Sequence, residues 1–162
     1  MIRVGLGFDA HGFVSDRPLV LGGVTIQQSP GLAGHSDADV VSHAIADALL
    51  GAARLGDLGA LFPNNERWRG APSLEILAEA RDAVVNAGWS ICNVDATVIM
   101  ERPRVAPFRD EMVDHIAKAL RIPTAEVGVK ATTTDGLGFA GRAEGVGALA
   151  VALIERRGER LG

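Results

Sequence analysis

The sequence has little of several features that mark whole classes of protein. It contains a single cysteine, Cys92, which excludes a disulfide framework and a cysteine-rich zinc module. It has no tyrosine and only 4% aromatic residues, too few for a platform on which nucleic-acid bases stack. Its net charge of −4 argues against the basic surface that binds phosphate backbones. We therefore expect no nucleic-acid partner.

Long apolar runs and targeting signals are also missing. The longest apolar run, Ala148 to Ile154, is much shorter than the roughly 18 residues of a membrane-spanning helix. The first residues, Met1 to Gly5, lack the charged start and long apolar stretch of a signal peptide. These two absences predict a cytoplasmic protein without a membrane partner.

What is present is typical of one globular domain. The chain has 162 residues, of which 48% are hydrophobic and 22% are charged. We find no linker and no internal repeat, so we expect a single domain over residues 1–162. The 20 glycines raise the entropic cost of folding, and so many of them suggest backbone that must approach another group closely.

Hydrophobic periodicity predicts alternating strands and helices. Ser36 followed by Asp39 has capping-box spacing, so we expect a helix from Ser36 that ends at Gly51 or Gly56. The composition of residues 144–157 favours a helix, but Gly145 and Gly147 disfavour one, and we assign a strand. The other predicted helices are Ser73–Asn86 and Phe108–Leu120, and the other predicted strands are Ile2–Phe8, Leu19–Leu21, Val24–Ile26, Trp89–Glu101 and Val127–Thr132. This order favours an α+β fold with helices packed on one face of a mixed β-sheet.

Three residues form a candidate metal site. Asp9 and His11 follow the first predicted strand, and residues two apart in an extended chain project to the same side. With His43 from the first helix they would leave a tetrahedral Zn²⁺ one open position, as in catalytic zinc sites. The alternative is an ordinary turn at the end of a strand. Asp39 and Asp47 lie four residues on either side of His43, and either could accept a hydrogen bond from its second ring nitrogen or belong to a solvated polar face.

Three further segments could bind anions. His35, Ser36 and Asp37 precede the predicted helix, where Ser36 would be a cap, a phosphate ligand or both. The hydroxyls of residues 132–134 and the Asp135 carboxylate follow a strand beside a glycine-rich turn, which suits phosphate and Mg²⁺ but also an ordinary strand end. Composition alone assigns Phe139 in the third segment, residues 138–144, to the core and pairs Arg142 with Glu144 at the surface.

Taken together, these segments resemble the family of 2-C-methyl-D-erythritol 2,4-cyclodiphosphate synthases of the non-mevalonate isoprenoid pathway. The similarity runs in the family's order from Ile2 to Ile154. The stretches that carry it are Gly7-Phe8-Asp9-Ala10-His11, Gly22-Gly23-Val24, His35-Ser36-Asp37-Ala38-Asp39-Val40 with His43, Leu55-Gly56-Asp57-Leu58-Gly59, Leu61-Phe62-Pro63, Asn93-Val94-Asp95, Lys130-Ala131-Thr132-Thr133-Thr134, Gly138-Phe139 and Gly141-Arg142.

The resemblance implies a lyase that cyclises 4-diphosphocytidyl-2-C-methyl-D-erythritol 2-phosphate and releases CMP. It implies one Zn²⁺ per subunit on Asp9, His11 and His43, and a second divalent cation, Mg²⁺ or Mn²⁺, on Asp135. His35 and Thr133 match the residues that stabilise the transition state. The residues that match substrate-binding positions are Asp9, His11, His35, Ser36, Asp57, Leu58, Gly59, Phe62, Glu66, Met100, Pro103, Arg104, Val105, Ala106, Ala131, Thr132, Thr133, Thr134, Asp135, Phe139 and Arg142.

The resemblance also implies an assembly. Family members are homotrimers whose sheets face the threefold axis and whose active sites lie between subunits, with the cytosine pocket of residues 100–106 and Ala131 contributed by the neighbour. Phe139, Arg142 and Glu144 would line a cavity on the axis, where we expect an isoprenoid diphosphate to bind.

The sequence departs from the family pattern at three places. Asp135 stands where Glu is usual, Asn64-Asn65-Glu66 replaces a more acidic stretch, and Arg104 stands where Lys is common. Two other functions remain open at this point: a trimer that binds nucleotide or isoprenoid phosphate without catalysis, and a zinc-dependent hydrolase that adds water to its product.

Overall fold

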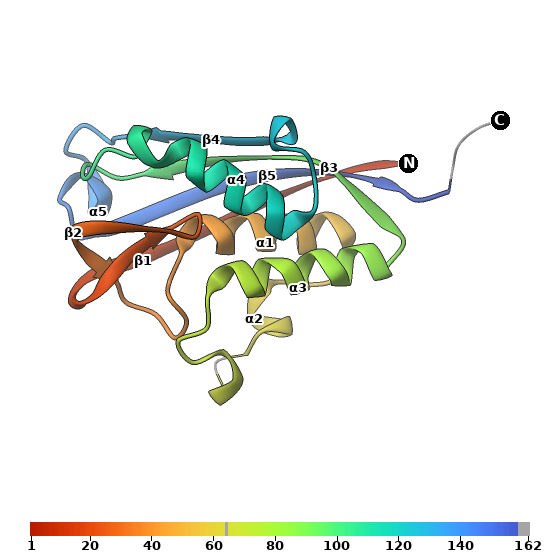
Figure 1. Ribbon diagram of the computed structural model, residues 1–162, viewed down its shortest axis with the longest axis horizontal. Helices are drawn as coiled ribbons and strands as arrows, with labels where there is room; N and C mark the ends of the chain where they lie inside the picture. The colour runs from red at the N-terminus through yellow and green to blue at the C-terminus, as the bar shows by residue number, and fades with distance from the viewer. Residues whose placement is uncertain (64, 159–162) are drawn as a thin grey trace.

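A computed structural model of the chain describes residues 1–63 and 65–158 (Figure 1). Its strands are β1 (Ile2–Leu21), β2 (Val24–Leu32), β3 (Trp89–Ile99), β4 (Val127–Thr132) and β5 (Gly145–Arg156). Its helices are α1 (Val40–Ala53), α2 (Leu58–Leu61), α3 (Ser73–Asn86), α4 (Arg109–Leu120) and α5 (Gly138–Gly141), and 3₁₀ turns lie at Glu66–Trp68, Ala106–Phe108 and Thr124–Glu126.

The strands form one mixed sheet in the order β2-β1-β5-β3-β4. β3 and β4 are parallel, and the other neighbours are antiparallel. Helix α1 packs on β1 and β5, α3 packs on α1, and α4 packs on α3 and β4 (Figure 1). The α+β prediction, with the helices on one face of a mixed sheet, is therefore confirmed.

The opposite face of the sheet carries exposed apolar side chains. Ile2, Val4, Leu6 and Phe8 alternate along β1 and are 53–68% exposed, while Gly5 and Gly7 between them lie against the backbone of α1. Val151 and Leu149 of β5 pair directly with Leu6 and Phe8 and are also exposed. This row of side chains is a continuous apolar surface on the single chain.

The first strand is much longer than predicted. The strand prediction ended at Phe8 and started again at Leu19, whereas β1 runs without interruption from Ile2 to Leu21. It pairs with β5 as far as Gly12 and with β2 from Phe13 on, so Asp9 and His11 lie within a continuous strand and not in a turn at its end, the alternative considered for them. Gly22 and Gly23, both at positive φ, form the tight turn of the hairpin that joins β1 to β2.

The first helix was predicted to begin too early. Ala38 has a φ of +58°, which an α-helix cannot include, and α1 begins only after Asp39. The Asp39 carboxylate accepts hydrogen bonds from the backbone N–H groups of Val41 and Ser42, so Asp39 rather than Ser36 is the cap. The helix ends at Ala53 on a left-handed Arg54, not at Gly51 or Gly56.

The second strand is also longer than predicted, because the prediction ended at Ile26 and β2 continues to Leu32. The later predicted elements match closely. Helix α3 and strand β4 have the predicted bounds, β5 confirms the strand at residues 144–157, and α4 and β3 differ from their predictions by one or two residues. The helices within the described ranges are all too short or too polar to span a lipid bilayer.

Candidate functional site: a metal-ligand cluster beside two pockets

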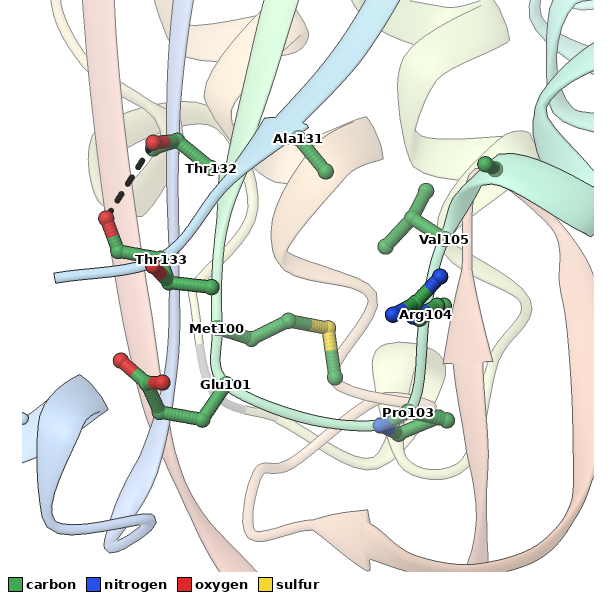
Figure 2. Close-up of a pocket in the computed structure, with 9 residues that line it drawn as sticks. Met100, Glu101, Pro103, Arg104, Val105, Ala131, Thr132 and Thr133 are labelled. Carbon is green, nitrogen blue, oxygen red and sulfur yellow. Dashed lines mark hydrogen bonds between the residues drawn. The ribbon is translucent and has the colours of Figure 1, made fainter. Parts of the chain in front are cut away.

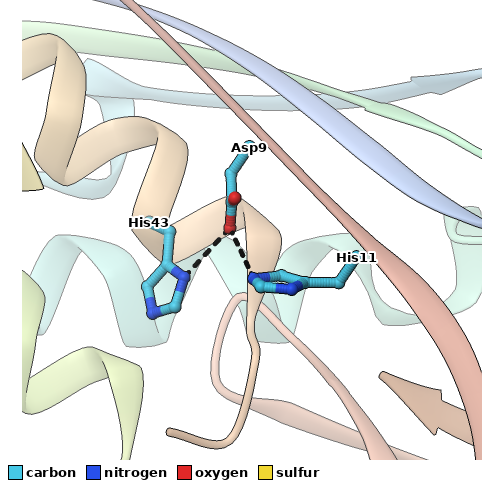
Figure 3. Close-up of side chains that lie close together, drawn as sticks. All are labelled: Asp9, His11 and His43. Carbon is cyan, nitrogen blue, oxygen red and sulfur yellow. Dashed lines mark hydrogen bonds and ion pairs between the residues drawn. The ribbon is translucent and has the colours of Figure 1, made fainter. Parts of the chain in front are cut away.

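Two strand residues and one helix residue bring their side chains together. Asp9 and His11 lie on the face of β1 that is covered by α1, and His43 lies in the first turn of α1. Oδ2 of Asp9 is 3.0 Å from Nδ1 of His43 and 3.1 Å from Nε2 of His11. Figure 3 shows the carboxylate between the two rings. The prediction that the side chains of Asp9 and His11 project to the same side and meet His43 is therefore confirmed.

The donor set fits a divalent metal. The three ligand atoms lie within 4.8 Å of one another. Donor atoms around a tetrahedral zinc are about 3.4 Å apart, so only a small opening of this cluster would admit an ion. Two imidazoles and one carboxylate also form the ligand set of catalytic zinc sites, which keep a fourth position for substrate.

The environment of the cluster shifts the pKa of two of its members in opposite directions. Burial by itself raises the pKa of Asp9, but the hydrogen bonds and charges of His11 and His43 outweigh it, and the pKa lies well below its usual range. Burial by itself lowers the pKa of His43, but the Asp9 hydrogen bond and the nearby carboxylates outweigh it, and the pKa is raised. Without a metal the cluster therefore favours an ionised Asp9 and a protonated His43.

The metal-free protein should lose stability as the pH rises above about 6.5, the ordinary pKa of a histidine. Because the folded-state pKa of His43 is raised, its contribution is complete below the unfolded value of about 6.5 and is lost as the pH rises through the folded value. Asp9 contributes to stability in the opposite sense. Because its folded-state pKa is lowered, its contribution is complete above about pH 4 and is lost as the pH falls toward that lowered pKa. Denaturant unfolding with a chelator present, at a series of pH values, measures this dependence.

Asp9→Asn is the control for this experiment, since it removes the carboxylate that raises the pKa of His43. The variant should lose most of this decline in stability above about pH 6.5. Zinc affinity should show the reverse trend and rise with pH, because the metal displaces a proton from His43. An identical decline in parent and variant would contradict the assignment.

A pocket of about 270 Å³ opens over the cluster. It brings together eight residues predicted from the sequence. Asp9, His11, His35, Ser36, His43, Leu58, Gly59 and Phe62 line it with Gly34, Trp68 and Ile76. His35 is held there by a 2.6 Å hydrogen bond between its Nε2 and the backbone oxygen of Asn65. Residues of β1, α1, α2 and α3 and of the segments between them thus converge on one hollow that includes the cluster.

The second nitrogen of His43 has partners that sequence analysis missed. Neither Asp39, which is fully buried as the cap of α1, nor Asp47, which accepts from the Leu58 N–H, hydrogen-bonds to the ring. Nε2 instead lies 2.9 Å from Oγ of Ser73 and 3.2 Å from Oγ of Ser36. For Asp39 both predicted alternatives were therefore wrong, because its carboxylate neither accepts a hydrogen bond from the His43 ring nor lies on a solvated face.

Two predicted residues lie near this pocket without lining it. The Asp57 carboxylate accepts from the Ala60 N–H and caps α2. The Glu66 carboxylate is 83% exposed and pairs with Arg69. Asn64, part of the less acidic stretch, lies outside the described residues.

A second pocket, also of about 270 Å³, collects the residues predicted to bind cytosine (Figure 2). It is lined by Met100, Glu101, Pro103, Arg104, Val105, Ala106, Ala131, Thr132 and Thr133. None of these residues lines the pocket over the metal-ligand cluster. One chain therefore holds the two predicted halves of the site in separate hollows.

Glu101 is a further residue that sequence analysis missed. Its Oε1 accepts hydrogen bonds from the backbone N–H of Thr134, at 3.0 Å, and of Gly136, at 3.5 Å. The turn it holds contains the exposed Asp135 at a φ of +51°, where Oδ1 accepts a hydrogen bond from the Thr133 hydroxyl. The hydroxyl-rich loop is thus fixed to the end of β3 by one carboxylate.

The segment around α5 forms a third hollow. Phe139 is 39% exposed and lines a pocket of about 240 Å³ with Glu144 and His11, so its assignment to the core was wrong. The predicted surface pair is confirmed, with Nε of Arg142 2.8 Å from Oε1 of Glu144.

Comparison with known sequences gives full-length relatives. The model of the YgbB family matches residues 2–155. A protein of Salinibacter ruber named 2-C-methyl-D-erythritol 2,4-cyclodiphosphate synthase is 54% identical over 95% of this chain and 99% of its own length. A protein of the same name from Pelotomaculum thermopropionicum is 50% identical over 98% of both chains.

Solved structures share the fold. The bifunctional IspDF from Campylobacter jejuni superposes with a TM-score of 0.92 at 41% identity, over 96% of this chain, and this chain spans 42% of that one. A 2C-methyl-D-erythritol-2,4-cyclodiphosphate synthase described as the CDP-bound form gives a TM-score of 0.86 at 37% identity, over 94% of this chain and all of the other. IspF of Plasmodium falciparum, described as a CDP complex, superposes with a TM-score of 0.84 at 33% identity, over 96% of this chain and 97% of that one.

Proposed function

The chain belongs to the YgbB family of 2-C-methyl-D-erythritol 2,4-cyclodiphosphate synthases, lyases of isoprenoid biosynthesis, and on this premise we propose its substrate, metal and assembly. The substrate is 4-diphosphocytidyl-2-C-methyl-D-erythritol 2-phosphate, and the products are the cyclic diphosphate and CMP. The observation that carries the proposal is the cluster of Asp9, His11 and His43 at the base of a pocket lined by family-matching residues.

The reaction is an intramolecular phosphoryl transfer. An oxygen of the 2-phosphate forms a bond to the β-phosphorus, and the bond from that phosphorus to the CMP oxygen breaks. CMP leaves with the electron pair, and no water is consumed. Such a transfer depends on positioning and on neutralising charge, so it needs no covalent step from the protein.

Asp9, His11 and His43 would hold Zn²⁺, which supplies Lewis-acid polarisation of a phosphate oxygen. His35, held by the Asn65 oxygen, lies in the same pocket and would stabilise charge on the transferring group with Thr133. Leu58 and Gly59 line that pocket and, with Asp57, would contact the ribose and erythritol region. Asp135 would hold the second cation, Mg²⁺ or Mn²⁺, with one methylene less reach than Glu.

The other proposed contacts fall in two groups. Thr132, Thr133 and Thr134 would hold the diphosphate, and the pocket of Met100, Pro103, Arg104, Val105, Ala106 and Ala131 would take cytosine. Ser36, Phe62 and Glu66 would border the erythritol. The CDP described in two similar structures supports a cytidyl nucleotide as ligand.

A homotrimer would join the two pockets. His35 and Thr133 are proposed to act on one phosphoryl group, yet within one chain they line different hollows. A neighbouring subunit that contributes its nucleotide pocket resolves this separation. The exposed apolar row on β1 and β5 supports the sheet face as the surface turned toward the threefold axis. Phe139 and Arg142 would then border an axial cavity for an isoprenoid diphosphate.

Phosphorus NMR tests the reaction directly. The zinc-loaded protein is incubated with the cytidyl substrate and Mg²⁺ in ¹⁸O-labelled water. We expect CMP and the cyclic diphosphate in equal amounts, without ¹⁸O in either. A linear, ¹⁸O-labelled product would show a hydrolase, and no turnover with tight binding would show a binding protein; either result overturns the proposal.

Glu101→Ala should lower kcat about 10-fold without loss of zinc. The substitution removes the acceptor for the Thr134 and Gly136 N–H groups, so the loop that carries Thr133 and Asp135 loses its fixed position. Steady-state kinetics and metal analysis measure the two effects. Glu126→Ala, which also removes a glutamate but lies outside both pockets, is the control and should match the parent. Unchanged kinetics for Glu101→Ala would show that the anchoring is not needed.

Mixed trimers should recover activity that neither parent variant has. Asp9→Ala disables the metal-ligand cluster and Arg104→Glu disables the nucleotide pocket, so a trimer containing both retains an intact site between two unmodified halves. Co-refolding the two inactive proteins, followed by activity and native mass measurements, tests this. Confirmed mixed trimers without activity would place each site within one chain.

A further inference from the structure

The imidazole of His43 is held at both nitrogens. Nδ1 faces the Asp9 carboxylate at 3.0 Å, and Nε2 faces Oγ of Ser73 at 2.9 Å. Ser73 lies 30 residues later, at the start of α3, and its side chain is fully buried. The contact therefore joins the ligand helix to a second helix behind it.

Ser73 is in turn bound to Asp37. The Ser73 hydroxyl donates to Oδ1 of Asp37, and the Ser73 backbone N–H donates to Oδ2 at 3.0 Å. Asp37 is further held by the Asp39 N–H, which donates to Oδ1 at 3.2 Å. Both carboxylate oxygens are thus engaged, and the carboxylate can act only as an acceptor.

These contacts determine the direction of each hydrogen bond. A serine hydroxyl has one proton, and the Asp37 carboxylate takes it, so toward His43 the Ser73 oxygen can only accept. The proton between them must then lie on Nε2 of His43. In the neutral imidazole this leaves the lone pair on Nδ1, the atom that faces Asp9 and His11. Ser36, at 3.2 Å from Nε2, accepts from the Ala38 N–H and is a longer contact.

The serine is not used as a helix cap. Helix α3 has Pro72 at its cap position, and no side chain caps it there. Ser73, the first helical residue, turns its hydroxyl inward instead, and the Asp37 carboxylate accepts its backbone N–H from outside the helix. The Ser73 hydroxyl therefore contacts the ring of His43 instead of stabilising the start of the helix, as serine often does.

We propose that Ser73 is a positioning residue that couples Asp37 to His43, fixes the proton on Nε2 and presents Nδ1 to the metal. This inference rests on the metal site proposed above. The linked hydrogen bonds from imidazole to hydroxyl to carboxylate make Nδ1 of His43 a stronger electron-pair donor to a metal. They also prevent the ring from rotating. Such outer partners of a metal ligand commonly change metal affinity by about 10–100-fold.

Zinc affinity of the intact protein tests the inference. Dissociation constants are measured by competition with a chromogenic chelator for the parent, Ser73→Ala and Ser42→Ala. Ser42 is an equally buried serine next to His43, but its hydroxyl donates to Asp39. We expect Ser73→Ala to raise the dissociation constant about 10–100-fold and Ser42→Ala to leave it near the parent value. A parent that binds no zinc would refute the metal site itself, whereas tight zinc binding by Ser73→Ala would refute only the role of Ser73.

A double-mutant cycle and a spectrum separate coupling from a structural effect. Asp37→Asn should weaken zinc binding in the parent but add little in Ser73→Ala, because the path from Asp37 to the ring is already broken. Equal effects in both backgrounds would overturn the coupling. In the zinc-loaded parent, ¹⁵N NMR of His43 should show the proton on Nε2. A proton on Nδ1 would overturn the proposal even if Ser73→Ala does not fold.

Discussion

His43→Ala should reduce the zinc content of the purified protein from about one ion per chain to nearly none. The substitution removes one of the three donors in the cluster and leaves Asp9 and His11, and two protein ligands rarely retain catalytic zinc. The loss of affinity should exceed the about 10–100-fold that the loss of an outer partner costs. Cyclisation activity should fall with the metal. Metal analysis of parent and variant, prepared side by side, measures the occupancy.

His115→Ala is the matched control for this experiment. His115 is also a partly buried histidine, but its Nδ1 contacts the Gly23 carbonyl oxygen at 3.1 Å and it is not part of the cluster. Its variant should keep full zinc and activity. Circular dichroism of metal-free His43→Ala should match that of the metal-free parent. Full zinc occupancy in a folded His43→Ala would mean that the metal binds elsewhere.

Local patterns were sufficient for most elements of the fold. Helix α3 and strand β4 were predicted with their observed bounds, because the helical period of α3, the stop at Gly88 and the residue types of β4 are local signals. The predicted start of α1 was wrong because the Asp39 carboxylate also accepts hydrogen bonds from the N–H groups of Gly22 and Gly23, which lie 17 and 16 residues away. That long-range demand selects Asp39 over Ser36 as the cap. The length of β1 was missed because its second half depends on pairing with β2.

The candidate site was predictable to the same extent. The side-chain alternation of an extended chain placed Asp9 with His11, and the helical period placed His43 on a polar stripe of α1. The roles of Ser73 and Glu101, and the contact of Asp37 with Ser73, were missed because these contacts join residues 30 to 36 positions apart. No spacing rule covers such distances, and only the packing of α3 against α1 and of the β4 loop against β3 creates them.

The glycines of β1 approach another group closely, as their number in the sequence suggested. Their number suggested backbone that approaches another group, and in β1 that group is the backbone of α1 rather than a ligand. A Cβ atom at Gly5 would lie 1.9 Å from the Ala48 oxygen, and one at Gly7 would lie 2.0 Å from the Ala44 oxygen. Ala44 follows His43, and Gly7 lies two residues before Asp9. The two glycines therefore set how closely the helix that carries His43 approaches the strand that carries Asp9 and His11.

Gly7→Ala should destabilise the protein by about 4 kcal/mol or more and separate His43 from Asp9. The added methyl group would overlap the Ala44 oxygen and lie 2.6 Å from the Ala48 nitrogen, and both are backbone atoms of a regular helix. No side-chain rotation relieves that overlap, so α1 must move away from β1. Denaturant unfolding of the metal-free protein at fixed concentration measures the stability. Zinc competition measures the separation as lost affinity.

Gly51→Ala makes the same chemical change in α1 without the overlap. A Cβ atom at Gly51 would have no heavy atom within 4 Å, and its helical position favours alanine by about 0.5–1 kcal/mol. This variant should be slightly more stable than the parent and bind zinc equally well. The opposite signs of the two changes distinguish the close approach of β1 to α1 from any general effect of replacing glycine. A stability of Gly7→Ala within about 1 kcal/mol of the parent would show that α1 can move without cost. The spacing of the metal ligands would then have to be maintained by the contacts of His43 with Ser73 and Ser36.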